Sequence, residues 1–245
     1  MKKNDFKLIA KEVIGKEINS LKKLRSNINF SFNKAVETIL KCKNGKIILS
    51  GVGKSGIIAK KISATFASTG TPSFFLDASN ASHGDMGQIS SNDVLILISH
   101  SGETNELKNI IQFASRNKKI VLIGITSKKN SLLYRNSNIN LHLPEVIEVD
   151  PAHIVPTSST IVQLSIGDAL AVACMRARRF SKLDFKKFHP SGSLSTKLKT
   201  VEDLMISGTK LPVINENKLM KKALSVISLK KLGVIIVTNK KGNTV

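Results

Sequence analysis

The chain has 245 residues, 41% of them hydrophobic, which is long enough to bury the core of one large domain. Its formal net charge is +21, but the lysines are scattered in pairs and only 4% of the residues are aromatic, which does not favour nucleic-acid binding. The longest apolar stretch in the C-terminal half, residues 169–175, is too short to span a bilayer, and the first residues lack the apolar core of a signal peptide. The two cysteines, Cys42 and Cys174, have no metal-ligand spacing, so no metal site is predicted. We therefore expect a folded cytoplasmic protein with neither a nucleic-acid nor a membrane partner.

Residues 1–43 are predicted to be helical, because apolar residues recur there at three- and four-residue spacings. We interpret this segment as an N-terminal helical arm. From residue 44 to residue 196, short apolar runs alternate with amphipathic stretches. The runs predict strands over residues 46–50, 73–76, 94–99, 120–126 and 139–143. This alternation is typical of an α/β fold with a doubly wound, parallel, five-stranded sheet flanked by helices.

Two further segments follow the predicted sheet. Residues 158–178 are predicted to form one long helix with a buried apolar face. Residues 201–245 have a different character, with helices expected over 201–205 and 221–229 and a strand over 233–238. A unit of that size has little core of its own.

Two short loops carry the strongest functional signal in the chain. Residues 51–56 (Gly-Val-Gly-Lys-Ser-Gly) follow the first predicted strand, and residues 99–106 (Ser-His-Ser-Gly-Glu-Thr-Asn-Glu) follow the third. In an open α/β sheet, ligands bind at the carboxyl ends of the strands. Small residues let the backbone approach a phosphate, helix starts offer free N–H groups, and hydroxyls add donors. The loops therefore predict a pocket for a phosphorylated sugar.

A dinucleotide site is the rival interpretation of the first loop. The glycines fit the pattern Gly-x-Gly-x-x-Gly, and Asp77 ends the next predicted strand. Against it stand Lys54, a cation inside the glycine turn, and the second loop, which a nucleotide does not require. A Walker A motif is excluded because Ile48 stands where its first glycine is required.

The motifs taken together resemble the sugar isomerase (SIS) domain family, and within it the arabinose 5-phosphate isomerases. The resemblance covers nearly all of residues 40–195. It is carried by the segments 51–56, 65–72, 83–87, 101–103, 156–160, 167–171 and 189–190. Full-length members of that family carry two CBS modules after the isomerase domain, and residues 201–245 resemble the opening part of the first. We therefore expect an incomplete CBS fragment after an SIS domain at 44–196.

The resemblance implies an aldose–ketose isomerase that interconverts D-ribulose 5-phosphate and D-arabinose 5-phosphate through an enediol. Such a reaction needs a base, an acid and a charge that stabilises the enediolate, but no redox cofactor. The resemblance further implies a homotetramer and a product that feeds the synthesis of Kdo for lipopolysaccharide. Two alternatives stay open: a module that senses a sugar phosphate without turnover, and an isomerase for another ketose phosphate. The number of ionisable residues in the motifs argues against a pure sensor.

The resemblance also implies the site residues. Matched motif by motif, the catalytic set is Lys54, Glu106, Glu148 and His189. In this hypothesis Glu148 or His189 abstracts the proton, Lys54 stabilises the enediolate or the phosphate, and Glu106 orients or relays. The candidate substrate-binding residues are Ser55, Gly70, Thr71, His83, Ser99, Ser101, Thr104 and Ser158. The histidines at 100, 142 and 153 are assigned no role.

Overall fold

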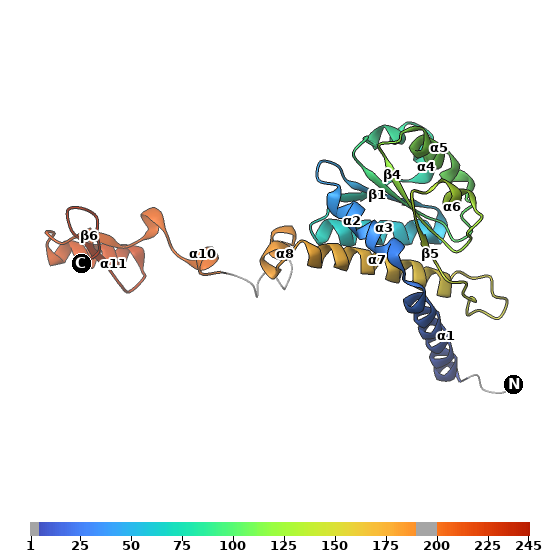
Figure 1. The fold of residues 1–245 in the computed structure, drawn as a ribbon. Helices are drawn as coiled ribbons and strands as arrows, with labels where there is room; N and C mark the ends of the chain where they lie inside the picture. Colours follow the sequence, from blue (N-terminus) through green and yellow to red (C-terminus); the bar gives the residue numbers. More distant parts are fainter. Residues whose placement is uncertain (1–4, 190–199) are drawn as a thin grey trace. The chain divides into compact units, whose positions relative to one another are not determined.

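The computed structural model describes residues 5–189 and 200–245 (Figure 1). Its internal contacts divide the chain into two compact units, residues 1–189 and 190–245. The first unit holds the sheet and all the predicted site residues. Each unit is described by itself.

A parallel sheet of five strands forms the centre of the first unit, as predicted. The strands are β1 (Ile47–Gly51), β2 (Ser73–Phe75), β3 (Val94–Ile98), β4 (Val121–Thr126) and β5 (Ile139–His142). Their order is β2-β1-β3-β4-β5 and every neighbouring pair is parallel. The order reverses between β1 and β3, which makes their carboxyl ends the switch point where such sheets bind ligands. The two loops singled out in the sequence leave the sheet at this point.

Alternating side chains of the strands supply two separate hydrophobic cores. Leu49 and Ile96 belong to one core, while Ile48 and Leu95, their chain neighbours, belong to the other. Because successive side chains of a strand point to opposite faces, an apolar run with no alternation builds both cores. This explains why β1, β3 and β4 are nearly continuous apolar runs in the sequence.

Helices cover both faces of the sheet (Figure 1). The first core is closed by α1 (Phe6–Asn27), α2 (Phe30–Lys41), α3 (Gly53–Ser68) and α7 (Ser158–Ala177). The second core is closed by α4 (Ala78–Ala81), α5 (Lys108–Arg116) and α6 (Leu132–Asn136). Short 3-10 helices, η1 (Asp85–Gln88) and η2 (Asn105–Leu107), lie in the loops, and α8 (Lys182–Phe188) follows α7. The segment predicted to be helical contains two helices, because the Asn29 side chain accepts a hydrogen bond from Ser31 N and starts α2.

Helices α3 and α7 run side by side in the same direction. Near their middles Lys61 forms an ion pair with Asp168, and Gly167 packs directly under Ile62. A Cβ on Gly167 would lie 2.2 Å from Ile62 Cδ1, so the glycine allows the close approach. At their ends, Arg178 donates to the carbonyl of Gly70. Both helices therefore start at the carboxyl edge of the sheet and end at the opposite edge.

Helix α7 is the single described helix that is long and apolar enough to cross a membrane. Half of its most apolar window is buried, and residues such as Ile166 and Leu170 belong to the first core. Its apolarity therefore follows from its place against α3 and α2 in the folded unit.

The second unit is small. It contains α10 (Val201–Leu204), η3 (Gly208–Lys210), β6 (Val213–Asn215), α11 (Met220–Lys230) and β7 (Ile236–Thr238). Strands β6 and β7 pair in parallel. Strand β6 was not predicted from the sequence, because its three residues are too few to show a period. The assignment of this unit to a CBS fragment stays a prediction.

Candidate functional site

The loop after β1 presents the start of α3 to an open space. Gly53 has φ +59°, and apart from its chain neighbours and its own helix backbone no atom of the described residues lies within 4 Å of the position that a Cβ would take there. No side chain caps the helix at Val52, so its first N–H groups are available to a ligand. Lys54 is exposed on this first turn and has no ion-pair partner among residues 5–189 and 200–245. A free cation and a bare helix start together favour an anionic ligand.

The loop after β3 is held in shape by its own hydroxyls. The Ser99 and Thr104 side chains hydrogen-bond each other at 2.8 Å, and Ser99 Oγ accepts from Gly102 N. Gly102 has φ +68°, and a Cβ there would lie 2.1 Å from Ser131 Oγ. Ser101 Oγ accepts from Glu103 N. Of the predicted substrate-binding hydroxyls, those of Thr71, Ser99 and Ser158 are buried, and Ser99 holds this loop.

Glu148 is held in front of α7 by that helix's first residues. Its Oε2 accepts from Thr157 N at 2.7 Å, from Thr157 Oγ1 at 2.9 Å and from Ser159 N at 3.3 Å. Partial burial raises the pKa of Glu148, but the hydrogen bonds from Ser159 and Thr157 together outweigh it and hold the pKa below its ordinary value. The side chain is therefore a carboxylate at neutral pH, with a fixed orientation.

Lys54 and Glu148 line the same open cavity, whose volume is ≈ 670 Å³. Its other polar lining comes from the start of α3, the β3 loop, the segment between β5 and α7, and α7 itself, and consists of Ser55, His100, His153, Ser159, Thr160 and Gln163. The cavity thus opens at the switch point of the sheet, with a cation and a carboxylate on its wall. Such a cavity has the size of a small-molecule site.

Removing the Thr157 hydroxyl tests how Glu148 is held. We expect Thr157→Val to raise the pKa of Glu148, because one hydrogen bond to the charged form is lost. Thr157→Ser keeps the hydroxyl and should leave the pKa unchanged. The measurement is a ¹³C NMR titration of the Glu148 carboxyl carbon in both variants. Identical titration curves for Thr157→Val and wild type would show that the hydroxyl does not hold the carboxylate.

Two predicted residues lie at the same edge of the sheet but outside this cavity. Glu106 is exposed on η2, and His83 is exposed in the turn after α4. Helix α4 packs against η2, and Asn109 donates to Ser82 Oγ, so these two segments are neighbours. The structure does not bring either side chain to the wall that carries Lys54.

Three predicted residues lie at the opposite end of the unit. Gly70 and Thr71 follow the last turn of α3, and both accept a hydrogen bond from Arg178, at 2.7 and 2.6 Å. His189 follows α8, stacks on Phe185 at 3.8 Å and hydrogen-bonds its carbonyl. Because the 16 residues of α3 span about 24 Å, Lys54 lies far from all three in one chain.

A family model described as SIS domain matches residues 39–173, more than half of the chain. The chain belongs to the SIS domain family. The arabinose 5-phosphate isomerase KdsD of Francisella tularensis is 44% identical over 231 residues, which are 93% of this chain and 70% of that protein. The KdsD isomerase of Yersinia pestis is 41% identical over 95% of this chain and 71% of that protein.

A solved structure extends this likeness to a ligand complex. The protein c3406 of E. coli CFT073, in complex with arabinose 5-phosphate, is 36% identical with a TM-score of 0.73, and the match covers 77% of this chain and 100% of that chain. The predicted SIS family, isomerase class and α/β fold are therefore confirmed. The site residues carried over from the family stay predictions.

In this SIS domain, Asp77 has a structural task that explains the false dinucleotide signal. Its Oδ1 accepts from Ser79 N at 2.9 Å and from Asn80 N at 3.2 Å, which caps α4. The cap accounts for an acidic residue at this position without a nucleotide. The glycine pattern reflects the turn into α3.

Sequence reasoning missed several residues of the cavity wall. Thr157 and Ser159 fix Glu148, His153 Nδ1 lies 2.7 Å from the Glu148 carbonyl oxygen, and His100 and Gln163 line the cavity. A polar Gln163 on the buried face of an apolar helix was the available signal. His100 gave none, because a single residue within a loop has no periodicity.

Proposed function

We propose that this protein interconverts D-ribulose 5-phosphate and D-arabinose 5-phosphate. The observation that carries the proposal is the cavity at the switch point, where the Lys54 ammonium and the Glu148 carboxylate face one space. The identity to the KdsD isomerases over most of the chain supports this choice of substrate. The reaction moves a proton between C1 and C2 without net oxidation, so it needs no redox cofactor.

The chemistry assigns a step to each of these two groups. With the aldose as the reactant, Glu148 removes the C2 proton. The electron pair of the C2–H bond forms the C1–C2 double bond of an enediolate, which carries its charge on O1. Lys54 stabilises that charge. A proton then passes from O2 to O1, and Glu148 returns the abstracted proton to C1, which gives the ketose. A carboxylate can serve as base here because its hydrogen bonds keep it ionised and aimed.

His189 can join this chemistry only from another copy of the chain. Within one chain it lies at the far end of α3 and α7, beside Phe185. If His189 is catalytic, as the resemblance implies, then each site combines Lys54 of one copy with His189 of another. This supports the proposal of an oligomer, for which we propose a homotetramer.

Mixed oligomers test that arrangement. We expect Lys54→Met and His189→Ala to be inactive alone, and the two chains co-expressed with different tags to recover about a quarter of wild-type activity, the share of sites that combine intact residues in random assembly. The measurement is the isomerase rate of hetero-oligomers purified through both tags. Purified hetero-oligomers without activity would contradict a shared site.

A panel of substrates tests the function itself. Purified protein is assayed without added cofactor on D-arabinose 5-phosphate, a hexulose 6-phosphate and a heptulose 7-phosphate. The proposal expects kcat/KM for arabinose 5-phosphate to exceed the others by at least about 100-fold, since binding differences of a few kcal/mol separate such substrates. A higher kcat/KM for the hexulose or heptulose phosphate would show that this longer ketose phosphate, and not arabinose 5-phosphate, is the substrate. Binding without turnover of any of them would indicate a sensor.

The remaining expectations follow from this function. We propose that the protein acts in the cytoplasm and that its product feeds Kdo synthesis for lipopolysaccharide. The second unit, residues 190–245, carries no predicted catalytic residue, and its assignment to an incomplete CBS module stays part of the proposal.

A further inference from the structure

His100 lines the cavity of Lys54 and Glu148 and has an unused hydrogen-bonding atom in its ring. Its ring lines that cavity, and Nδ1 is buried without a hydrogen-bond partner in the described part of the chain. A buried polar atom without a partner is costly and is rare in native proteins. In a residue that lines a ligand cavity, such an atom points to a partner that the ligand supplies.

The backbone around His100 is fixed. Its carbonyl oxygen accepts from Ser127 N at 3.2 Å, from Ser127 Oγ at 2.8 Å and from Thr126 Oγ1 at 3.2 Å. Three donors on one carbonyl hold the loop against the end of β4. The backbone that carries the ring is therefore fixed before any ligand arrives, which lowers the entropy lost on binding.

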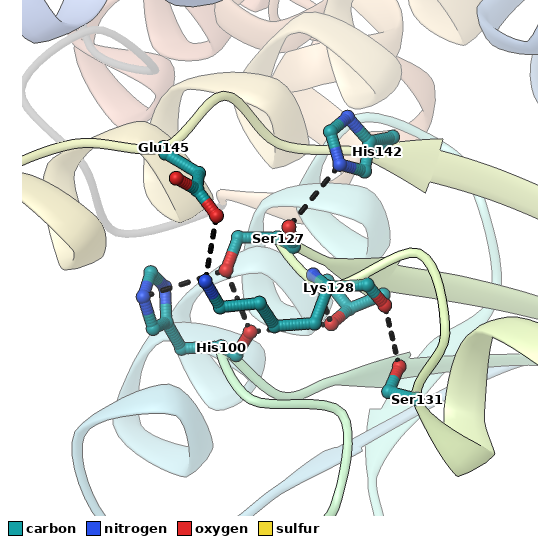
Figure 2. Close-up of polar contacts among 7 residues, drawn as sticks. His100, Ser127, Lys128, Ser131, His142 and Glu145 are labelled. Carbon is teal, nitrogen blue, oxygen red and sulfur yellow. Dashed lines mark hydrogen bonds and ion pairs between the residues drawn. The ribbon is translucent and has the colours of Figure 1, made fainter.

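The tautomer of the ring follows from the Ser127 hydroxyl. Figure 2 shows Ser127 between the rings of His100 and His142. Ser127 Oγ donates its one proton to the His100 carbonyl, so toward His100 Nε2, at 3.4 Å, it can only accept. Nε2 then carries the ring proton, and Nδ1 is left as an acceptor. Burial, the largest influence on this ring, lowers the pKa of His100 and favours that neutral form.

Gln163 supplies a second acceptor on the same wall. Its side chain is 1% exposed, it lines the same cavity, and its Oε1 has no hydrogen-bond partner among the described residues. Two unpartnered acceptors call for a ligand with donors. A sugar chain carries several hydroxyl donors, whereas a phosphate dianion carries none.

We propose that His100 is a substrate-binding residue of the isomerase, whose Nδ1 accepts a hydrogen bond from a hydroxyl of the open-chain sugar, with the Gln163 amide oxygen accepting from a second hydroxyl. His100 and Gln163 thus recognise the polyol part of the substrate, as distinct from its phosphate. This inference rests on the proposed function for the identity of the sugar phosphate.

Two substitutions of His100 separate this role from a structural one. His100→Leu removes the acceptor, while His100→Asn keeps one near the position of Nδ1. We expect His100→Leu to weaken the affinity for D-arabinose 5-phosphate and to raise its KM by about 10-fold, and His100→Asn to stay within about threefold of wild type. The affinity for inorganic phosphate should be unchanged in both.

His142→Leu is the matched control. This ring also contacts Ser127, through its carbonyl at 3.1 Å, but it lines a different cavity together with Lys128 and Glu145 (Figure 2). The affinity of His142→Leu for arabinose 5-phosphate should equal that of wild type. The melting temperature of each variant reports whether it folds.

Calorimetric titration with arabinose 5-phosphate and with inorganic phosphate reads the result without requiring turnover. A selective loss of sugar-phosphate affinity in His100→Leu, rescued in His100→Asn, supports the assignment of His100. If the wild type binds the sugar phosphate but is inactive, the proposed function is refuted and the assignment of His100 still stands. Unchanged sugar-phosphate affinity in folded His100→Leu, or an equal loss for inorganic phosphate, would overturn the assignment.

Discussion

Replacing Lys54 with methionine should lower kcat for the isomerisation of D-arabinose 5-phosphate by about 1,000-fold, the cost of removing one group that stabilises a developing oxyanion. Methionine keeps most of the length of the side chain and removes its charge. Since Lys54 is exposed and has no ion-pair partner in the described part of the chain, the substitution should not lower the melting temperature. The measurements are steady-state kinetics and a thermal melt.

Lys60→Met is the control for this substitution. Lys60 lies on the same helix α3 and is also exposed, but it does not line the cavity of Lys54. Its kcat should stay within about twofold of wild type. A rise in KM with unchanged kcat in Lys54→Met would assign the lysine to binding, because an interaction made equally in substrate and transition state leaves kcat unaltered.

Glu148→Gln should lower kcat by about 1,000-fold, within the range that a general base contributes. The glutamine keeps the size of the side chain and an oxygen that can accept from Thr157 N, so the start of α7 should stay intact. It cannot take up the C2 proton. Kinetics at neutral pH, with circular dichroism as the test of folding, give the result.

Glu145→Gln is the matched control three residues earlier in the same segment. Glu145 pairs with Lys128 (Figure 2), and both line the cavity of His142 rather than that of Lys54. Loss of the Glu145 charge should therefore leave kcat near that of wild type. An exposed pair of this kind also contributes little to stability. Equal losses in the two variants would mean that the segment, rather than the Glu148 carboxylate, sets the rate.

The sheet could be predicted from the sequence because its central strands β1, β3 and β4 are largely apolar runs. Leu49 and Ile48 face different cores, so both positions are apolar, and the runs of β1, β3 and β4 end where a glycine or serine starts a loop. Strand β6 was not predicted, because three residues show no period. The break before α2 was not predicted either, because a single cap, Asn29, decides where that helix starts.

The site could be predicted only in part. Lys54 and Glu148 were named from motifs, and the structure places them on one cavity. The separation of His189, Gly70 and Thr71 from that cavity could not be foreseen, because it depends on the parallel course of α3 and α7. Likewise, His100 gains its significance from Ser127, a residue 27 positions later that fixes its ring proton.

The most direct test of the proposed isomerase is proton NMR of D-arabinose 5-phosphate incubated with the protein in D₂O without added cofactor. An enediol mechanism with a base at C2 predicts that signals of ribulose 5-phosphate grow, that the C2 proton signal of the remaining arabinose 5-phosphate fades, and that neither occurs with Glu148→Gln. If wild-type protein leaves the C2 proton in place while arabinose 5-phosphate still raises its melting temperature, the cavity binds a sugar phosphate without isomerising it, and the account is wrong.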